Sequence, residues 1–248
     1  MVGCCRPILT ISLTMKKAGS FTGFSNETLS FLKSLQANNN KDWFEKHKED
    51  YNLFLLNPLK NLVNDLSEFM LTIDSRFEVR PAINRTISRI HRDTRFTKDK
   101  SPYKTTAWIT FKRPKKDWKD SPAYFFELSR YSYRFGMGLY SASPTTMSLL
   151  REAIDEKPEE FDKVNTLYNK QDVFHIEGER YVRIMDKSKS SEVLNWYQQK
   201  NLYFVCNRNI DKLLFSSGLV ENLLSSFSLL EPLYQYLLKV RENETKIT

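Results

Sequence analysis

The sequence predicts an α+β fold in which helices flank a largely antiparallel sheet. Apolar residues recur at helical spacing in the first third of the 248-residue chain, and the middle third alternates with a period of two. Helical spacing returns toward the C-terminus. No Pro-, Gly- or Ser-rich segment divides these parts, so we expect residues 19–248 to form a single domain.

The first third is predicted to be helical because each expected helix has a start signal. Apolar residues at helical spacing follow Ser25, a candidate N-cap. Asp42 lies three residues before Glu45, as in a capping box. Asn57 followed by Pro58 indicates that a new helix begins there, with Asn57 as its cap.

The middle of the chain is predicted to form strands. Residues 105–112 alternate, with Ala107, Ile109 and Phe111 on one face of a half-buried strand. The other expected strands are 123–129 and 131–141, paired as one hairpin, 174–176 and 181–185, paired as a second, and 202–206.

Two proline pairs begin the next predicted helices. Ser143 precedes Pro144 and Lys157 precedes Pro158, which favours helices that start at these points. A last helix is expected from residue 218 onward, with a break at Pro232 because proline interrupts helical hydrogen bonding.

Residues 1–18 are expected to lie outside the domain as a disordered or non-native extension. A second methionine, Met15, precedes the first convincing helix, and the apolar stretch before it lacks a cleavage site of the signal-peptide type. The cysteines Cys4, Cys5 and Cys206 are too few for a disulfide framework, which favours a reducing, cytoplasmic location. No apolar run is long enough to cross a membrane.

The net charge of +8 comes from one region. Of 38 basic and 30 acidic residues, twelve and four lie between positions 85 and 120, which leaves 26 of each sign elsewhere. Within residues 85–104 seven cations are crowded together, and such crowding requires counterions, solvent or a ligand. Helical spacing is present in this segment, but its Thr and Ile content favours a strand that ends near Arg92, followed by a loop anchored by Tyr103.

The leading functional hypothesis is an anion site for a phosphate-bearing small molecule or nucleotide, with turnover left open. Arginine binds phosphate through a planar fork of donors. The predicted anion-binding residues are Arg89, Arg92, Arg95 and Lys100, and the predicted orienting residues are Asp93, Asp99 and Tyr103.

Two alternatives remain open. The first is a non-enzymatic RNA-binding or ribosome-associated protein that uses residues 85–119, where Lys115 and Lys116 lie between Trp108 and Trp118. The second is a structural domain whose arginines pair internally with acidic side chains.

The sequence indicates neither a metal site nor a bound cofactor. His47, His91 and His175 are scattered singly, and no phosphate-binding loop, dinucleotide fingerprint or Cys-x-x-Cys pair occurs. The oligomeric state is not predicted.

The basic segment also carries a resemblance to a known family. The string Arg89-x-x-Arg92-Asp93-x-Arg95-Phe96, followed by Asp99-Lys100-x-x-Tyr103, resembles the pattern of a bacterial family catalogued as domain of unknown function 2461. Further similarity lies at residues 38–44 and 136–140. The resemblance extends over about residues 21–240 and implies no particular activity.

Overall fold

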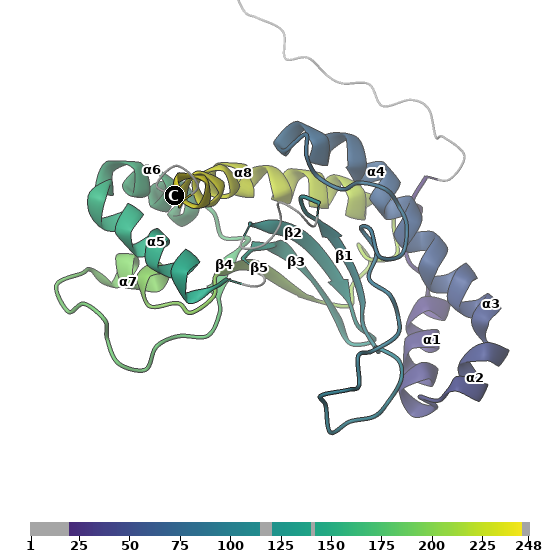
Figure 1. Cartoon of the computed structure of the whole chain (residues 1–248). Coiled ribbons are helices and arrows are strands. Elements are labelled where there is room, and N and C mark those ends of the chain that lie inside the picture. The colour runs from purple at the N-terminus through teal and green to yellow at the C-terminus, as the bar shows by residue number, and fades with distance from the viewer. Residues whose placement is uncertain (1–19, 115–120, 140–141, 245–248) are drawn as a thin grey trace, which may run out of the picture.

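A five-stranded antiparallel sheet forms the centre of the molecule (Figure 1). The computed structural model describes residues 20–114, 121–139 and 142–244. The strand order is β1-β2-β3-β5-β4, and every neighbouring pair is antiparallel. The strands are β1 (Ala107–Phe111), β2 (Ala123–Leu128), β3 (Ser132–Gly138), β4 (His175–Glu177) and β5 (Tyr203–Asn209).

Helices precede and follow the strands, so the predicted α+β class is confirmed. The N-terminal group is α1 (Asn26–Ala37), α2 (Lys41–Lys46), α3 (Lys48–Asp50), the π-helical segment η1 (Tyr51–Leu56) and α4 (Asn57–Ile73). The later helices are α5 (Pro144–Glu156), α6 (Pro158–Asn169), α7 (Ser191–Tyr197) and α8 (Gly218–Glu244). Whether residues 19–248 fold as one domain stays a prediction, and residues 1–18 lie outside the described residues.

Helices α4 and α8 cover one face of the sheet (Figure 1). Successive strand residues point to opposite faces, so alternate residues of each strand meet these helices. Ile109, Phe126, Phe135 and Phe204 are fully or almost fully buried in the resulting core. We call this the covered face, and the side that carries Trp108, Phe125 and Arg134 the open face.

The predicted helix start at Asn57 is wrong, because the chain enters α4 without leaving the helix. Asn57 has helical dihedral angles, and its N–H donates to the carbonyl of Asn52, five residues back. Pro58 has no N–H to donate, and the wider π turn precedes it. The helix start predicted at Asp42 is also shifted. The N-cap of α2 is Asn40, whose side chain accepts from Trp43 N at 2.9 Å.

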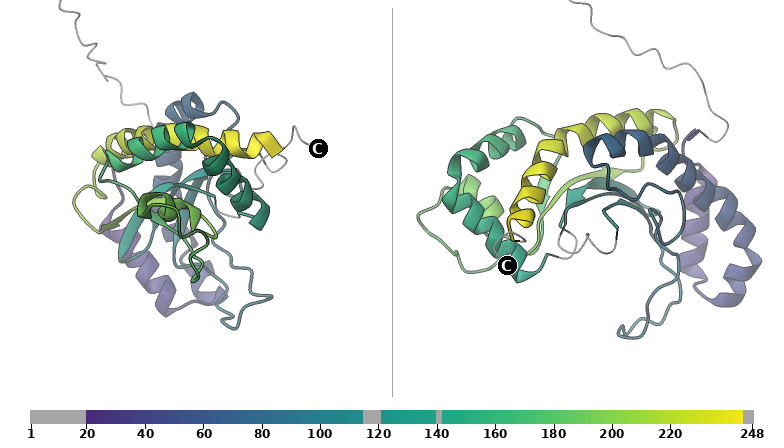
Figure 2. Two further views of the ribbon diagram at one scale, coloured as in Figure 1. Left: turned by 90° about the vertical axis from the view of Figure 1, so that its left-hand side faces the viewer. Right: turned by 45° about the horizontal axis from the view of Figure 1, so that its top comes forward.

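The predicted break at Pro232 is wrong for a similar reason. Helix α8 continues through this proline, and Figure 2 shows the helix change direction along its length. Leu230, Leu233 and Tyr234 on either side of it are buried. Packing therefore compensates for the hydrogen bond that proline removes.

The second predicted hairpin is also wrong. β4 pairs with β5, and residues 181–185 form no strand. Gly178 has a φ of 153°, which redirects the chain after Glu177. Val182 is fully exposed, so these apolar residues lack the sheet partner that the sequence pattern suggested.

The basic segment extends the sheet irregularly beyond β1. Single bridges join Ile87 to Ile109 and His91 to Tyr103. Arg92 N donates to Pro102 O at 2.8 Å, which closes a loop that projects past the sheet (Figure 1). We call residues 91–103 the basic hairpin. The expected strand is thus reduced to isolated bridges, and the expected loop is ordered.

Candidate ligand-binding site

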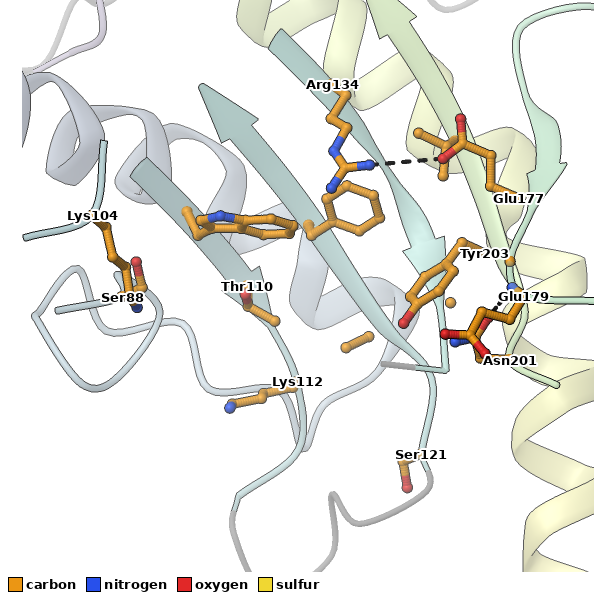
Figure 3. Close-up of a pocket in the computed structure, with 16 residues that line it drawn as sticks. Ser88, Lys104, Thr110, Lys112, Ser121, Arg134, Glu177, Glu179, Asn201 and Tyr203 are labelled. Carbon is orange, nitrogen blue, oxygen red and sulfur yellow. Dashed lines mark hydrogen bonds and ion pairs between the residues drawn. The ribbon is translucent and has the colours of Figure 1, made fainter. Parts of the chain in front are cut away.

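A cavity of about 560 Å³ lies on the open face of the sheet (Figure 3). Such a volume is within the usual range for small-molecule sites. Lys104 and Ser88 lie at one end of the cavity, and Glu177, Glu179 and Asn201 lie at the other (Figure 3). Its walls also include Trp108, Thr110, Lys112, Ser121, Phe125, Arg134, Tyr203 and Val205.

Small residues make the floor of this cavity. Ala123 and Gly138 face each other across β2 and β3 and both line it. A Cβ at Gly138 would lie 2.4 Å from the carbonyl oxygen of Leu202, and one at Gly136 would lie 1.9 Å from that of Phe204. Glycine is therefore required at both positions because the neighbouring backbone comes too close for a side chain.

Aromatic rings and one arginine form the wall above the floor. The rings of Trp108 and Phe125 are 5.5 Å apart between centroids. The Arg134 guanidinium lies 5.4 Å from the Trp108 ring centroid and 6.0 Å from that of Phe125. Arg134 also pairs with Glu127, and its Nη1 lies 3.7 Å from Glu177 Oε2. These contacts hold the two rings, tilted by 37° to each other, in place beside the Arg134 guanidinium, and a planar group can stack on such side chains.

The Lys104 ammonium is the cation of this site that lacks a counterion among the described residues. Its side chain is partly buried, and no ion pair forms there. Burial and the nearby Arg89 guanidinium lower the pKa of Lys104. Arg89 is exposed and likewise forms no ion pair within the part of the chain that the structure describes. A partly buried ammonium without an ion-pair partner among the described residues, next to a second cation, favours the arrival of an anion.

The other predicted anion-binding residues have partners inside the basic hairpin. Arg92 pairs with Asp99. Arg95 donates from Nη2 to Asp93 Oδ2 at 2.7 Å and from Nε to Oδ1 at 3.0 Å. Lys100 Nζ donates to the carbonyl of Thr94 at 2.8 Å. The predicted cluster is therefore divided: these three cations brace the hairpin, and Arg89 lies close to Lys104.

Tyr103 anchors the basic hairpin to the helices. Its side chain is buried and stacks on Phe44, with ring centroids 4.3 Å apart. The Asn39 side chain accepts from Tyr103 N at 3.0 Å and donates to Tyr103 O at 2.9 Å. The base of the hairpin is thus fixed to the turn between α1 and α2.

A second, polar hollow of about 430 Å³ lies between the basic hairpin and α1. Lys104 lines both hollows, so they adjoin at this side chain. The second hollow is otherwise lined by Gln36, Asn39, Arg92, Asp99, Ser101, Tyr103, Thr105 and Thr106.

Sequence reasoning did not find Phe125, Arg134 or Tyr203. They lie on strands β2, β3 and β5, and only the strand register brings them to one face. Lys115, Lys116 and Trp118, which belong to the predicted second basic run, lie outside the described residues. Among the described residues, no group of three or more His, Cys, Asp or Glu side chains could hold a metal ion.

A family model described as conserved hypothetical protein, domain of unknown function 2461, matches residues 27–236. The chain belongs to this family. The match begins in α1, ends in α8 and includes every residue of both hollows, so the candidate site is part of the domain of unknown function 2461. No curated protein matches the chain. No helix in the described part of the family domain is long and apolar enough to span a bilayer.

Proposed function

We propose that this member of the domain of unknown function 2461 family binds a phosphate-bearing small molecule with a planar ring, such as a nucleotide, on the open face of its sheet. The observation that carries the proposal is the position of Lys104. This partly buried cation has no counterion among the described residues, and it lies at the end of a cavity with aromatic walls. The phosphate binds Lys104 and Arg89, and the ring stacks in the cavity.

The cavity offers a cation for the phosphate of such a ligand and aromatic side chains for its ring. A charge-assisted hydrogen bond from an ammonium is stronger than a neutral one. Trp108 and Phe125 offer an aromatic wall, and the absence of a side chain at Gly138 lets a ring approach the backbone closely. Of the predicted anion-binding set, the proposal assigns Arg89 to direct phosphate contact. Arg92, Arg95 and Lys100 of that set contact partners within the basic hairpin and are assigned no phosphate of this ligand.

Thermal unfolding with adenosine monophosphate, adenosine and inorganic phosphate tests this proposal. A ligand that binds only the native state raises the melting temperature, and we expect adenosine monophosphate to do so most strongly. Titration calorimetry of Lys104→Gln should show roughly ten- to a hundredfold weaker binding, the value of one charge-assisted contact. Arg89→Gln should also weaken binding. Without ligand it should melt at the same temperature as wild type or higher, because a repelled cation is removed.

Lys98→Gln is the matched control. It removes the same charge from the same segment, but Lys98 is exposed and lines neither hollow. This variant should keep the affinity for adenosine monophosphate. If it loses as much affinity as Lys104→Gln, the effect is one of general charge and the assigned site is wrong. Absence of stabilisation by all three compounds at millimolar concentration would also overturn the proposal.

A further inference from the structure

We infer that the nucleotide in the sheet-face cavity is the terminal residue of a single-stranded nucleic acid whose adjoining phosphates lie along the basic hairpin. This inference rests on the proposed function and names the class of ligand. It is argued from a different observation, the basic hairpin. This hairpin begins near the end of the cavity, is held by internal ion pairs, and exposes cations and an aromatic ring.

The cavity and the second hollow, beside the hairpin, share one lining residue. Lys104 lines both of them, so a phosphate held by Lys104 lies at their junction. The second hollow is lined mainly by hydroxyl, amide and charged side chains, among them Arg92, Ser101 and Thr106. Such donors suit a sugar–phosphate backbone and would bury no base.

The basic hairpin presents cations to solvent and neutralises its own carboxylates. Asp93 and Asp99 pair with Arg95 and Arg92, so neither carboxylate is left to repel a phosphate. Lys98 and Lys100 are exposed beyond these pairs. Two cations in excess in the hairpin, added to Arg89 and Lys104, give the sign of charge that a nucleic-acid backbone requires.

Phe96 lies within this charged loop with 90% of its surface exposed. The Arg95 guanidinium is 5.4 Å from its ring centroid. An exposed phenylalanine is unfavourable in water, and aromatic rings with neighbouring arginines are the surfaces on which single-stranded bases stack. The pairing of Arg95 with Asp93 and a bond from Thr97 Oγ1 to Asp99 O at 2.8 Å keep the loop in shape. The ring is therefore held outward before any ligand arrives.

A single strand fits these features better than a duplex does. The cavity is floored by backbone at Gly138, so a base that enters it must leave its neighbours and its pairing partner. Bases in single strands and at strand ends are free to do this at low cost. A free nucleotide in the cavity would leave the Phe96 ring exposed.

The test compares a short RNA of about six nucleotides with adenosine monophosphate by titration calorimetry on the full chain. We expect the RNA to bind at least about tenfold more tightly and its affinity to fall steeply with salt. Phe96→Ala should weaken RNA binding by about tenfold and leave the affinity for the mononucleotide unchanged. Phe96→Trp, which keeps a stacking surface, should retain RNA affinity.

Lys98→Gln adds a second readout. It should reduce the slope of log affinity against log salt for RNA by about one and leave mononucleotide binding unaltered. If RNA binds no more tightly than the mononucleotide, or binds wild type and Phe96→Ala equally, the strand inference is overturned while the mononucleotide site stands. A different outcome is that Phe96→Ala weakens RNA binding but Lys104→Gln does not weaken mononucleotide binding. The cavity is then not the nucleotide site, and the inference that rests on it is overturned as well.

Discussion

At the scale of single residues, the partly exposed Asp93 carboxylate of the basic hairpin is held by one arginine. Arg95 reaches both oxygens with its side chain and donates to Oδ1 from its backbone N–H at 3.2 Å. These bonds, together with the charge of Arg89, lower the pKa of Asp93 to about 2. Because both partners are exposed, water screens their attraction. The pair therefore orders the loop but adds little to the free energy of unfolding of the whole domain.

Acid should therefore loosen the hairpin before it unfolds the sheet. The folded pKa of Asp93 lies below the value of about 3.9 for an unfolded aspartate. The stabilisation is thus complete above pH ~4 and is lost as pH falls toward 2. The backbone amide of Arg95 should shift through this range in NMR spectra of wild type. Asp93→Asn should remove that transition, and an unchanged titration in the variant would contradict the assignment.

At the scale of elements, a buried charged cluster joins α4, the end of β1 and α8. Asp74, at the end of α4, accepts from Arg113 Nε at 2.6 Å and from the Tyr234 hydroxyl at 2.5 Å. Arg113 also donates to Glu242 at 2.9 Å. Burial and the neighbouring Asp74 raise the pKa of Tyr234. The two helices of the covered face are therefore fixed to the sheet by polar bonds as well as by apolar packing.

Removal of Arg113 should cost far more than removal of an exposed cation that contacts the same glutamate. Arg113→Ala leaves the buried Asp74 carboxylate without its cation, so we expect a loss of roughly 3–5 kcal/mol. Arg76 is half exposed and lies 3.1 Å from Glu242. Arg76→Ala should cost about 0–1 kcal/mol. Urea unfolding midpoints of the Arg113→Ala and Arg76→Ala variants test this difference. Equal losses of stability would contradict a larger contribution from the buried ion pair.

Local sequence patterns predicted the helices and strands better than the contacts between segments that are distant in sequence. The helix after Ser25 and the alternation of Ala107, Ile109 and Phe111 were predicted correctly, because both depend on residues close in sequence. The break at Pro232 was not, because packing of distant residues outweighs one lost hydrogen bond. The basic segment was located from its charge, but the pairing of its arginines depends on the path of the loop.

The open-face site could not be predicted for a related reason. Trp108, Phe125 and Tyr203 lie on three strands, and the sequence does not give the register that brings them together. Each of them looks like an ordinary strand residue in its own segment. The family resemblance, which the family match confirms, pointed to residues 136–140 but not to the floor that Gly138 helps to form.

At the scale of the whole molecule, the two faces of the sheet are unequally protected. The covered face packs on α4 and α8 (Figure 1). The open face carries the cavity, which residues of β1, β2, β3 and β5 line (Figure 3). Strand β3 is hydrogen-bonded on both sides and contacts α8. The basic hairpin is anchored at its base, through Tyr103.

Amide hydrogen exchange should follow this division. Phe135 and Met137 of β3 are expected to exchange most slowly, near the limit set by global unfolding. The amides of Arg95 and Ser101, which bond to exposed carboxylates, should exchange much faster. Exchange measured by NMR resolves these sites. Comparable protection of the hairpin and β3 would mean that the hairpin belongs to the cooperative core.

The close approach of β3 and β5 limits how the proposed ligand site could change during evolution. Substitution of Gly136 or Gly138 would force β5 away from β3, so selection against misfolding holds the depth of the cavity constant. The wall is made by side chains and not by backbone at Trp108, Phe125 and Tyr203, so we expect substitutions there to change the shape of the cavity more readily. Homologues with a different ligand preference should therefore differ at these walls and share the two glycines. Directed evolution of a new specificity should begin at the same three positions.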